Sequence, residues 1–390
     1  MQDLLIVGGG YAGLWAAMAA AGRAREAAGE LHIRLLSKDA YLTHRPRLYE
    51  SDPRGKRTPL AQVLEPIGVE LLVGEVDAVD LAQRRVGVAG GGNGGGHAYD
   101  RLLLAAGSVL HRPAIEPAGG RTWNIDQYDA AVALDDHLGQ LMADDGDIGI
   151  VVVGAGFTGI ELATEMRARL AHHGGADRAA RARLALVDRA AAVGEDIGPS
   201  LRPHIMAALR AAGVDLHLND QVRRVEAARA VLASGATIPS RTVIVTAGAR
   251  ASGLAGLMPV ELDELGRLPV DPMLRVDGVD GVYAAGDLAR AFVDEEHIAL
   301  MSCQHAMVMG KYAGHNAAGD LLGLPLVPYR QDRYVTCLDL GSWGAVFSDG
   351  WSREVQAIKQ DAKQRKQVTM TQRIYPPSGD AAAILEAARL

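Results

Sequence analysis

Two glycine-rich motifs carry the clearest chemical signal in this sequence. Each has the pattern Gly-x-Gly-x-x-Gly, follows an apolar run of strand length and continues into a helical pattern. Glycine permits the tight turn and lets the backbone approach a pyrophosphate, while the helix N-terminus offers free N–H groups and the positive end of its dipole. The motifs comprise Gly8, Gly10 and Gly13, then Gly154, Gly156 and Gly159. Further candidate contacts are the residues between the glycines, Tyr11, Ala12, Phe157 and Thr158. Two such loops predict two bound dinucleotides.

The second strand of each βαβ unit is expected to end at a ribose-binding residue, usually Asp or Glu. After the second motif this residue is Asp188, which favours NADH, although Arg189 beside it leaves room for the 2′-phosphate of NADPH. After the first motif the position holds Ser37, followed by Lys38. Either the Ser37 hydroxyl or the carboxylate of Asp39 could serve there.

Small or acidic residues stand at three other predicted strand ends. One buried strand ends in Ala106 and Gly107, and a later strand repeats this pattern with Gly248. Small residues at such a position allow a ligand to approach closely. A third strand delivers Gly286 and Asp287. The Asp287 carboxylate could accept hydrogen bonds from a sugar alcohol chain, and the alternative is an ordinary acidic residue in a turn.

Three segments of the first half of the chain lie outside these patterns. The polar loop 41–49 contains Arg45, which could neutralise a pyrophosphate or lie in a solvated loop. Val76, in a short strand predicted over residues 75–79, is included among the candidate cofactor contacts. The glycine run at residues 90–96 predicts a flexible hairpin tip.

Length and composition limit the class of protein. A chain of 390 residues exceeds the size of one core, so two or three domains are expected. The net charge of −7 argues against a nucleic-acid partner. Cys303 and Cys337 are the only cysteines, too few for a disulfide framework and without metal-site spacing. With neither a signal segment nor an apolar run of ~18 residues, we expect a soluble cytoplasmic protein, or one attached to a membrane surface.

Together these motifs resemble those of two-dinucleotide flavoproteins, most closely the type II NADH dehydrogenases and their apoptosis-inducing-factor-like relatives in the FAD-dependent pyridine nucleotide-disulfide oxidoreductase family. The resemblance covers residues 4–323 and rests on four motifs in order, at 8–13, 99–108, 154–165 and 282–287. It implies that the first loop holds FAD and the second NAD(P)H. It also implies that Ala106 and Gly107 lie along FAD, that Asp287 binds its ribityl chain and that Glu161 lies by the nicotinamide. Without the resemblance, Glu161 would be a first-turn carboxylate that complements the helix dipole.

Residues 301–310 occupy the place where quinone-reducing members carry Ala-Gln-x-Ala-x-Gln-x-Gly on a helix whose N-terminus faces the flavin. Gln304 matches the first Gln, whereas Val308 replaces the second. A helix N-terminus there would stabilise negative charge on the flavin. Cys303 is adjacent, but the disulfide reductases need a close cysteine pair, which this sequence lacks. The catalytic candidates are therefore Glu161 and Gln304, and both Cys303 and Gln304 are also candidate cofactor contacts.

The expected fold is α/β, with two Rossmann-like dinucleotide-binding domains, the second inserted in the first, and a small C-terminal α+β domain. The predicted domains are residues 1–110 and 248–323 for FAD, 111–247 for NAD(P)H and 324–390 for the C-terminal interface domain. Helices are expected over residues 128–143 and 201–212 from their apolar spacing.

The resemblance implies an FAD-dependent NAD(P)H oxidoreductase that passes hydride from NADH to FAD and then electrons to an acceptor, with a quinone as first choice. One alternative is reduction of a ferredoxin-like protein, and another is a redox-sensing flavoprotein of the apoptosis-inducing-factor type. Residues 353–373 hold six Lys or Arg against two acidic residues. This basic face could meet an anionic membrane, such as the inner face of the cell membrane, or an acidic partner. The alternative is a solvated surface, and a homodimer is left open.

Overall fold

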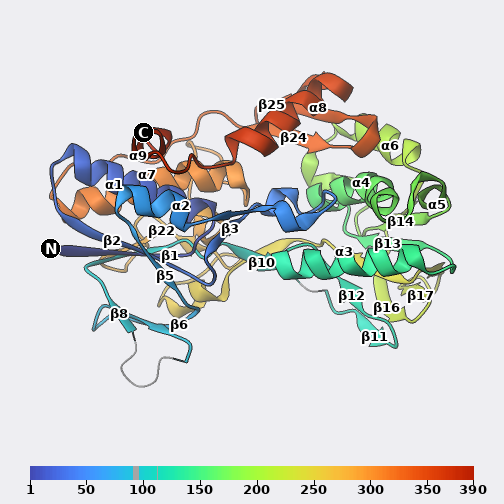
Figure 1. Ribbon diagram of the computed structural model, residues 1–390, viewed down its shortest axis with the longest axis horizontal. Helices are drawn as coiled ribbons and strands as arrows, with labels where there is room; N and C mark the ends of the chain where they lie inside the picture. The colour runs from blue at the N-terminus through green and yellow to red at the C-terminus, as the bar shows by residue number, and fades with distance from the viewer. Residues whose placement is uncertain (91–95, 112) are drawn as a thin grey trace.

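The computed structural model describes residues 1–90, 96–111 and 113–390 as an elongated molecule (Figure 1). Two units with parallel sheets lie end to end, and a smaller C-terminal unit lies along one side of both (Figure 1). Of the predicted hairpin tip at residues 90–96, residues 91–95 lie outside the described residues.

The first unit contains a five-stranded sheet of order β22-β9-β1-β2-β5 in which every pair is parallel. Its strands are β1 (Gln2–Val7), β2 (Leu31–Ser37), β5 (Glu70–Val73), β9 (Arg101–Leu104) and β22 (Val282–Ala284). Ile6 pairs with Leu35 on one side and with Leu103 on the other, and all three are fully buried. Continuous apolar runs of this kind suit strands that are covered on both faces.

Two long helices cover one face of this sheet, α1 (Tyr11–Glu26) and α7 (Cys303–Leu321) (Figure 1). Glycine at position 314 of α7 allows the two helices to approach very closely, since a Cβ there would overlap the carbonyl oxygen of Ala16 in α1. The same unit contains α2 (Ala61–Leu64), the pair β3 (Tyr41–Thr43) and β4 (Arg57–Pro59), and an antiparallel sheet of β6 (Val76–Asp80), β7 (Arg85–Val88) and β8 (Gly96–Ala98). The packing of α7 on α1 places the N-terminus of α7 beside the first glycine loop.

The second unit repeats the plan with a parallel sheet of order β12-β19-β13-β14-β15. Its strands are β12 (Thr122–Trp123), β13 (Gly149–Val153), β14 (Arg183–Val187), β15 (Val214–His217) and β19 (Thr242–Val245). Its helices are α3 (Tyr128–Ala143), α4 (Phe157–Gly174), α5 (Ala176–Ala180) and α6 (Arg202–Ala211). A smaller sheet holds β11 (Glu116–Ala118), β16 (Val222–Glu226), β17 (Arg229–Leu232) and β18 (Thr237–Pro239). The helices predicted over 128–143 and 201–212 are confirmed as α3 and α6.

The second unit is an insertion in the first. The chain leaves the first sheet after β9 and returns to it at β22, which pairs with β9. The two connecting segments pair antiparallel with each other as β10 (Ser108–Leu110) and β20 (Ala249–Ala251). On the return, the short strands β21 (Leu268–Pro269) and β23 (Ala289–Arg290) pair in parallel. The predicted α/β fold with one dinucleotide-binding unit inserted in another is therefore confirmed, while the residue boundaries of the domains stay a prediction.

The C-terminal unit packs on both of the others. It consists of an antiparallel sheet, β24 (Val335–Asp339), β25 (Ala345–Asp349) and β26 (Glu354–Ile358), followed by α8 (Lys359–Val368), a π-helix (Thr369–Arg373) and α9 (Ala381–Ala387). Leu338 and Val346 join the apolar core of the second unit, whereas Ile374 and Ile384 join that of the first. Across the described residues, every helix is too short or too polar to span a bilayer.

Candidate active site

The first glycine loop leaves open space in front of a helix N-terminus. A Cβ atom at Gly13 would overlap the carbonyl oxygen of Gly8, so α1 can pack on β1 only with glycine there. Gly10 precedes α1 with φ −79° and ψ −170°, and a Cβ on it would meet no heavy atom of the described residues within 4 Å. The vacant space at Gly10 fits a pyrophosphate.

The second glycine loop has the same geometry. A Cβ at Gly159 would overlap the carbonyl oxygen of Gly154, and Gly156 precedes α4 with φ −79° and ψ −171°. Among the described residues, no side chain caps the N-terminus of α1 or of α4. The first N–H groups of both helices are therefore left for an anionic ligand, as the fit of two dinucleotides requires.

The predicted ribose-binding residues lie against their loops. The Asp188 carboxylate accepts hydrogen bonds from the backbone N–H of Ala155, inside the second loop, and from that of Ala190 at 2.7 Å. Ser37 is buried, and its hydroxyl lies where a Cβ of Gly9 would stand. Both side chains are thus placed at the same point of the two units.

Lys38 and Val76 lie near the carboxyl ends of β2 and β5. The Lys38 ammonium pairs with the Glu75 carboxylate at 3.0 Å in an exposed ion pair. Ser37 of β2 pairs in register with Val73 of β5, three residues before Val76, which begins β6. The two predicted contacts therefore lie near the carboxyl edge of the first parallel sheet.

Arg45, Ser108 and Asp287 are brought together where the two large units meet. The Ser108 hydroxyl donates to the Asp287 carboxylate at 2.6 Å, and the Arg45 guanidinium donates to the Ser108 carbonyl oxygen at 3.0 Å. Arg45 also forms an ion pair with Asp126. Burial raises the pKa of Asp287, which follows the positive-φ residue Gly286 (φ 70°) and lies three residues beyond the end of β22. The arginine predicted to neutralise a pyrophosphate is thus held by protein groups beside Asp287.

The small-residue strand ends also face this junction. Ala106 and Gly107 follow β9, and Gly248 follows β19. The backbone N–H of Ser252 donates to the Gly107 carbonyl at 2.9 Å, and that of His111 donates to the Gly248 carbonyl at 3.0 Å. The two strand ends therefore lie on either side of the β10–β20 pair.

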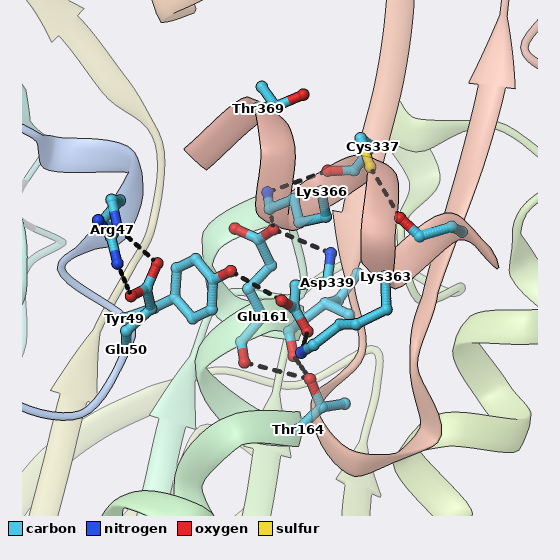
Figure 2. A network of polar contacts seen from close by, with 12 residues as sticks. Arg47, Tyr49, Glu50, Glu161, Thr164, Cys337, Asp339, Lys363, Lys366 and Thr369 are labelled. Carbon is cyan, nitrogen blue, oxygen red and sulfur yellow. Dashed lines mark hydrogen bonds and ion pairs between the residues drawn. The ribbon is translucent and has the colours of Figure 1, made fainter. Parts of the chain in front are cut away.

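Glu161 forms a buried ion pair with Lys366. The Lys366 ammonium lies 2.7 Å from the Glu161 carboxylate, and the two side chains are only 3% and 5% exposed. The backbone N–H of Asp339 donates to the same carboxylate at 3.0 Å, and Lys366 also donates to the Cys337 carbonyl at 3.0 Å. Figure 2 shows Lys366 reaching from α8 toward Glu161 on α4. The pair therefore joins the second unit to the C-terminal unit.

Burial brings the pKa of Glu161 toward neutrality. Burial raises the pKa of Glu161 to about 7, although the Lys366 ammonium and the Asp339 N–H favour the charged carboxylate. Burial is the largest single influence on the pKa of Lys366 and lowers it, but the attraction of the Glu161 carboxylate, the hydrogen bond to it and the nearby Cys337 and Asp339 together raise the pKa. A carboxyl that gains and loses its proton near pH 7 suits a general acid or base.

The pair lies beside residues predicted to contact the two dinucleotides. The Lys366 nitrogen is 5.6 Å from the ring centre of Phe157, the first residue of α4. Burial raises the pKa of the Cys303 thiol to about 11, with Lys366 opposing this shift and Asp287 adding to it. The Gln304 amide nitrogen is buried and has no hydrogen-bond partner among the described residues. An unpaired donor at the N-terminus of α7 fits a cofactor atom, and the thiol of Cys303 is poorly suited to act as a nucleophile.

A second polar cluster surrounds Asp339 (Figure 2). Its carboxylate pairs with the Lys363 ammonium at 2.6 Å and accepts hydrogen bonds from the Tyr49 hydroxyl at 3.0 Å and from the Gly341 N–H at 2.9 Å. Tyr49 comes from the first unit, so all three units meet at this cluster. The carboxylate of Glu161 is bound to Asp339 only through the backbone.

Sequence reasoning missed Lys366, Tyr49 and Asp339. Lys366 was assigned to the basic face at residues 353–373, and that assignment is wrong for this residue because its side chain is buried. Within α8 only Ala362 and Lys366 are buried. Their spacing of four residues in an otherwise polar helix was the one available signal that Lys366 faces inward.

Comparison with known proteins gives a consistent result. The sequence model of the pyridine nucleotide-disulphide oxidoreductase family matches residues 2–310. An NADH dehydrogenase-like protein of Mycobacterium tuberculosis is 42% identical over 395 residues, covering 100% of this chain and 98% of that protein. The type II NADH:quinone oxidoreductase of the same organism is 30% identical over 334 residues, covering 73% and 66%. A solved ferredoxin reductase from Rhodopseudomonas palustris has the same fold, with a TM-score of 0.74 at 21% identity over 90% of this chain and 82% of that one.

Proposed function

The chain belongs to the pyridine nucleotide-disulphide oxidoreductase family, and we propose that it is an NADH dehydrogenase that delivers electrons to a quinone. Membership makes it an FAD- and NAD(P)H-dependent oxidoreductase. The choice of a quinone is supported by the similarity to a type II NADH:quinone oxidoreductase. The single observation that carries the proposal is the Glu161–Lys366 ion pair, which is buried beside the second glycine loop.

The first unit holds FAD in this proposal. When bound, FAD accepts a hydride from NADH and passes two electrons to the acceptor. The loop with Gly8, Gly10 and Gly13 binds the pyrophosphate, and Asp287 binds the ribityl chain. The remaining proposed contacts are Tyr11, Ala12, Ser37, Lys38, Arg45, Val76, Ala106, Gly107, Gly286, Cys303 and Gln304.

The second unit holds the nicotinamide dinucleotide. The proposed contacts are Gly154, Gly156, Phe157, Thr158, Gly159, Asp188 and Gly248. We expect NADH to bind better than NADPH because the Asp188 carboxylate accepts ribose hydroxyls and repels a 2′-phosphate.

The Glu161–Lys366 pair supplies a proton. Oxidation of NADH by a quinone consumes one proton from solution for each quinol formed, since the quinone gains two electrons and two protons and NADH provides only a hydride. The proton bound by Glu161 is available for this step. Meanwhile the charge of Lys366, held in a water-poor site, stabilises negative charge that develops beside it.

The C-terminal unit offers a surface on which the protein could meet a membrane. Ile358 and Val368 are 37% and 38% exposed, and with Arg365 and Arg373 they line a groove of this unit. Apolar and basic side chains together suit the surface of an anionic bilayer, whose apolar interior dissolves quinones. We therefore propose that this surface contacts the membrane peripherally. A homodimer stays a prediction.

Rapid mixing tests the proposed function. The purified protein should be yellow, should bleach on addition of NADH and should regain its colour faster with a quinone than with air. Regain of colour no faster with quinones than with air would exclude the quinone. If a ferredoxin instead restored the colour in a strongly salt-dependent manner, the acceptor would be an acidic protein.

A further inference from the structure

A continuous chain of hydrogen bonds connects the first glycine loop to a threonine of β4. The Tyr11 hydroxyl lies 2.9 Å from Nδ1 of His44, and Nε2 of the same ring lies 2.9 Å from the Thr58 hydroxyl. Tyr11 is 8% exposed and His44 is fully buried, whereas Thr58 is partly exposed. In the described part of the chain, the Tyr11 hydroxyl has no hydrogen-bond partner other than His44.

The inner end of this chain lies at the predicted flavin site. Tyr11 is the first residue of α1 and directly follows Gly10, where the open space fits a pyrophosphate. The next residue, Ala12, touches the segment that carries Asp287, because a Cβ at Gly286 would lie only 2.7 Å from the Ala12 Cβ. Burial raises the pKa of the Tyr11 hydroxyl, and the nearby Cys303 of α7 adds to this rise. Tyr11 therefore stays protonated between the first glycine loop and the N-terminus of α7.

The His44 ring is neutral, so one of its nitrogens donates and the other accepts. Burial lowers the pKa of His44 to about 4, and the Arg47 guanidinium adds to this effect. With the ring proton on Nδ1, the Thr58 O–H donates to Nε2 and the Nδ1–H donates to the Tyr11 oxygen. The Tyr11 O–H is then left to donate to a ligand. With the ring proton on Nε2, the Tyr11 O–H would instead be used by His44.

A second tyrosine touches His44 but is not a member of the chain. The Tyr375 ring stacks on the imidazole with 3.8 Å between the ring centres. Its hydroxyl accepts from the Arg47 guanidinium at 2.8 Å, and Arg47 is also bound by the Glu50 carboxylate at 2.7 Å. The Tyr375 hydroxyl is thus bound by Arg47, and the residue supplies a matched control for Tyr11.

We propose that Tyr11 donates a hydrogen bond to the bound flavin and that His44 and Thr58 are positioning residues, which aim the Tyr11 hydroxyl at it. This inference rests on the proposed function, in which the first unit holds FAD. A donor that is aimed in advance at a group stabilises negative charge on that group better than a freely rotating hydroxyl does. Because the reduced flavin carries more negative charge than the oxidised flavin, the chain should favour the reduced form.

Redox titration of the FAD-loaded protein compares Tyr11→Phe with Tyr375→Phe. Each variant loses one tyrosine hydroxyl beside His44, but only Tyr11 belongs to the chain. Tyr11→Phe should lower the affinity for reduced relative to oxidised flavin by about tenfold, which lowers the two-electron midpoint potential by about 30 mV. Tyr375→Phe should keep the parent potential. Thr58→Val should lower the potential by a smaller amount, and Thr58→Ser, which keeps the hydroxyl, should have the parent value.

Nitrogen-15 spectra of labelled histidine give a readout that is independent of activity. In the FAD-loaded parent, the His44 ring should carry its proton on Nδ1, and Thr58→Val should give a mixture of the two tautomers. If Tyr11→Phe does not fold, the spectra and Thr58→Val decide in its place.

Three results would overturn the inference while leaving the proposed function intact. They are a His44 proton on Nε2 in the loaded protein, equal potentials in the parent and Tyr11→Phe, and an equal fall in Tyr375→Phe. A parent protein that takes up no FAD would instead overturn the proposed function, and the inference with it.

Discussion

Replacing Lys366 by methionine should make stability depend on pH above neutrality. Methionine keeps the length of the side chain and removes the charge that lies 2.7 Å from the Glu161 carboxylate. In the parent protein the folded-state pKa of Glu161 is raised from 4.5 to about 7. The folded protein therefore binds more protons than the unfolded chain between these values, so stability falls as pH rises through this window and is then level.

Without Lys366, the pKa of Glu161 must rise further, because burial still disfavours the carboxylate and its cation is gone. The fall in stability then continues above pH 7 at about 1.4 kcal/mol per pH unit. The stability of the parent no longer falls above about pH 7. At pH 9, two pH units higher, Lys366→Met should therefore be about 2.7 kcal/mol less stable than the parent. Breaking a typical buried ion pair costs about 3–5 kcal/mol. Below pH 7 the two should differ much less.

Urea unfolding of the FAD-loaded proteins from pH 6 to pH 9 measures this difference. Lys359→Met, on an exposed residue at the start of the same helix, is the matched control and should follow the parent. Adding Glu161→Gln to Lys366→Met removes the titrating group and should abolish the extra slope. A constant offset between Lys366→Met and the parent across the whole range would refute the reasoning, because the loss would then not come from the ionisation of Glu161.

Three further outcomes are expected. Gly159→Ala should raise KM for NADH by about a hundredfold, because a Cβ there displaces the second glycine loop. The first loop is unchanged, so the protein should stay yellow. Steady-state kinetics measure KM, and the ratio of flavin to protein absorbance measures the bound flavin. Asp188→Ser should shift the ratio of kcat/KM for NADPH over NADH upward by about tenfold, and an unchanged ratio would remove Asp188 from the ribose site. Arg54→Ala should cost about 1 kcal/mol in urea unfolding, because Arg54 is 46% exposed although its partner Asp135 is buried.

Much of the fold could be predicted because its signals are local. A strand, a glycine turn and a helix lie within one short stretch at each loop, and the third glycine of each is required by contact with the first. The boundaries of α3 coincide with the predicted 128–143 for a similar reason, since its apolar residues recur at helical spacing. Asp188 and Asp287 could be proposed from the sequence because Asp188 directly follows β14 and Asp287 comes three residues after β22, and parallel strands of one sheet end at the same edge.

The candidate site was less accessible to prediction because half of it comes from the C-terminal unit. Lys366 belongs to a helix rich in charge, and only the docking of that helix on α4 distinguishes it from its exposed neighbours. Tyr49 and Asp339 are 290 residues apart and meet through one hydrogen bond between units. Arg45, whose charge suggested a phosphate contact, is bound by Asp126 and Ser108 in this structure, and its role toward a cofactor stays a prediction.

Helix α4 links these features into one arrangement. Its uncapped N-terminus faces the second glycine loop, its second turn carries Glu161, and its next turns pack against the C-terminal unit. A buried carboxylate at this place is tolerable only with a cation opposite it, since an unpaired buried charge is expensive. The C-terminal unit supplies that cation as Lys366, and in doing so closes the pair to water. The C-terminal unit is thus a part of the site itself. A dinucleotide bound at the N-terminus of α4 would contact the same helix that carries Glu161.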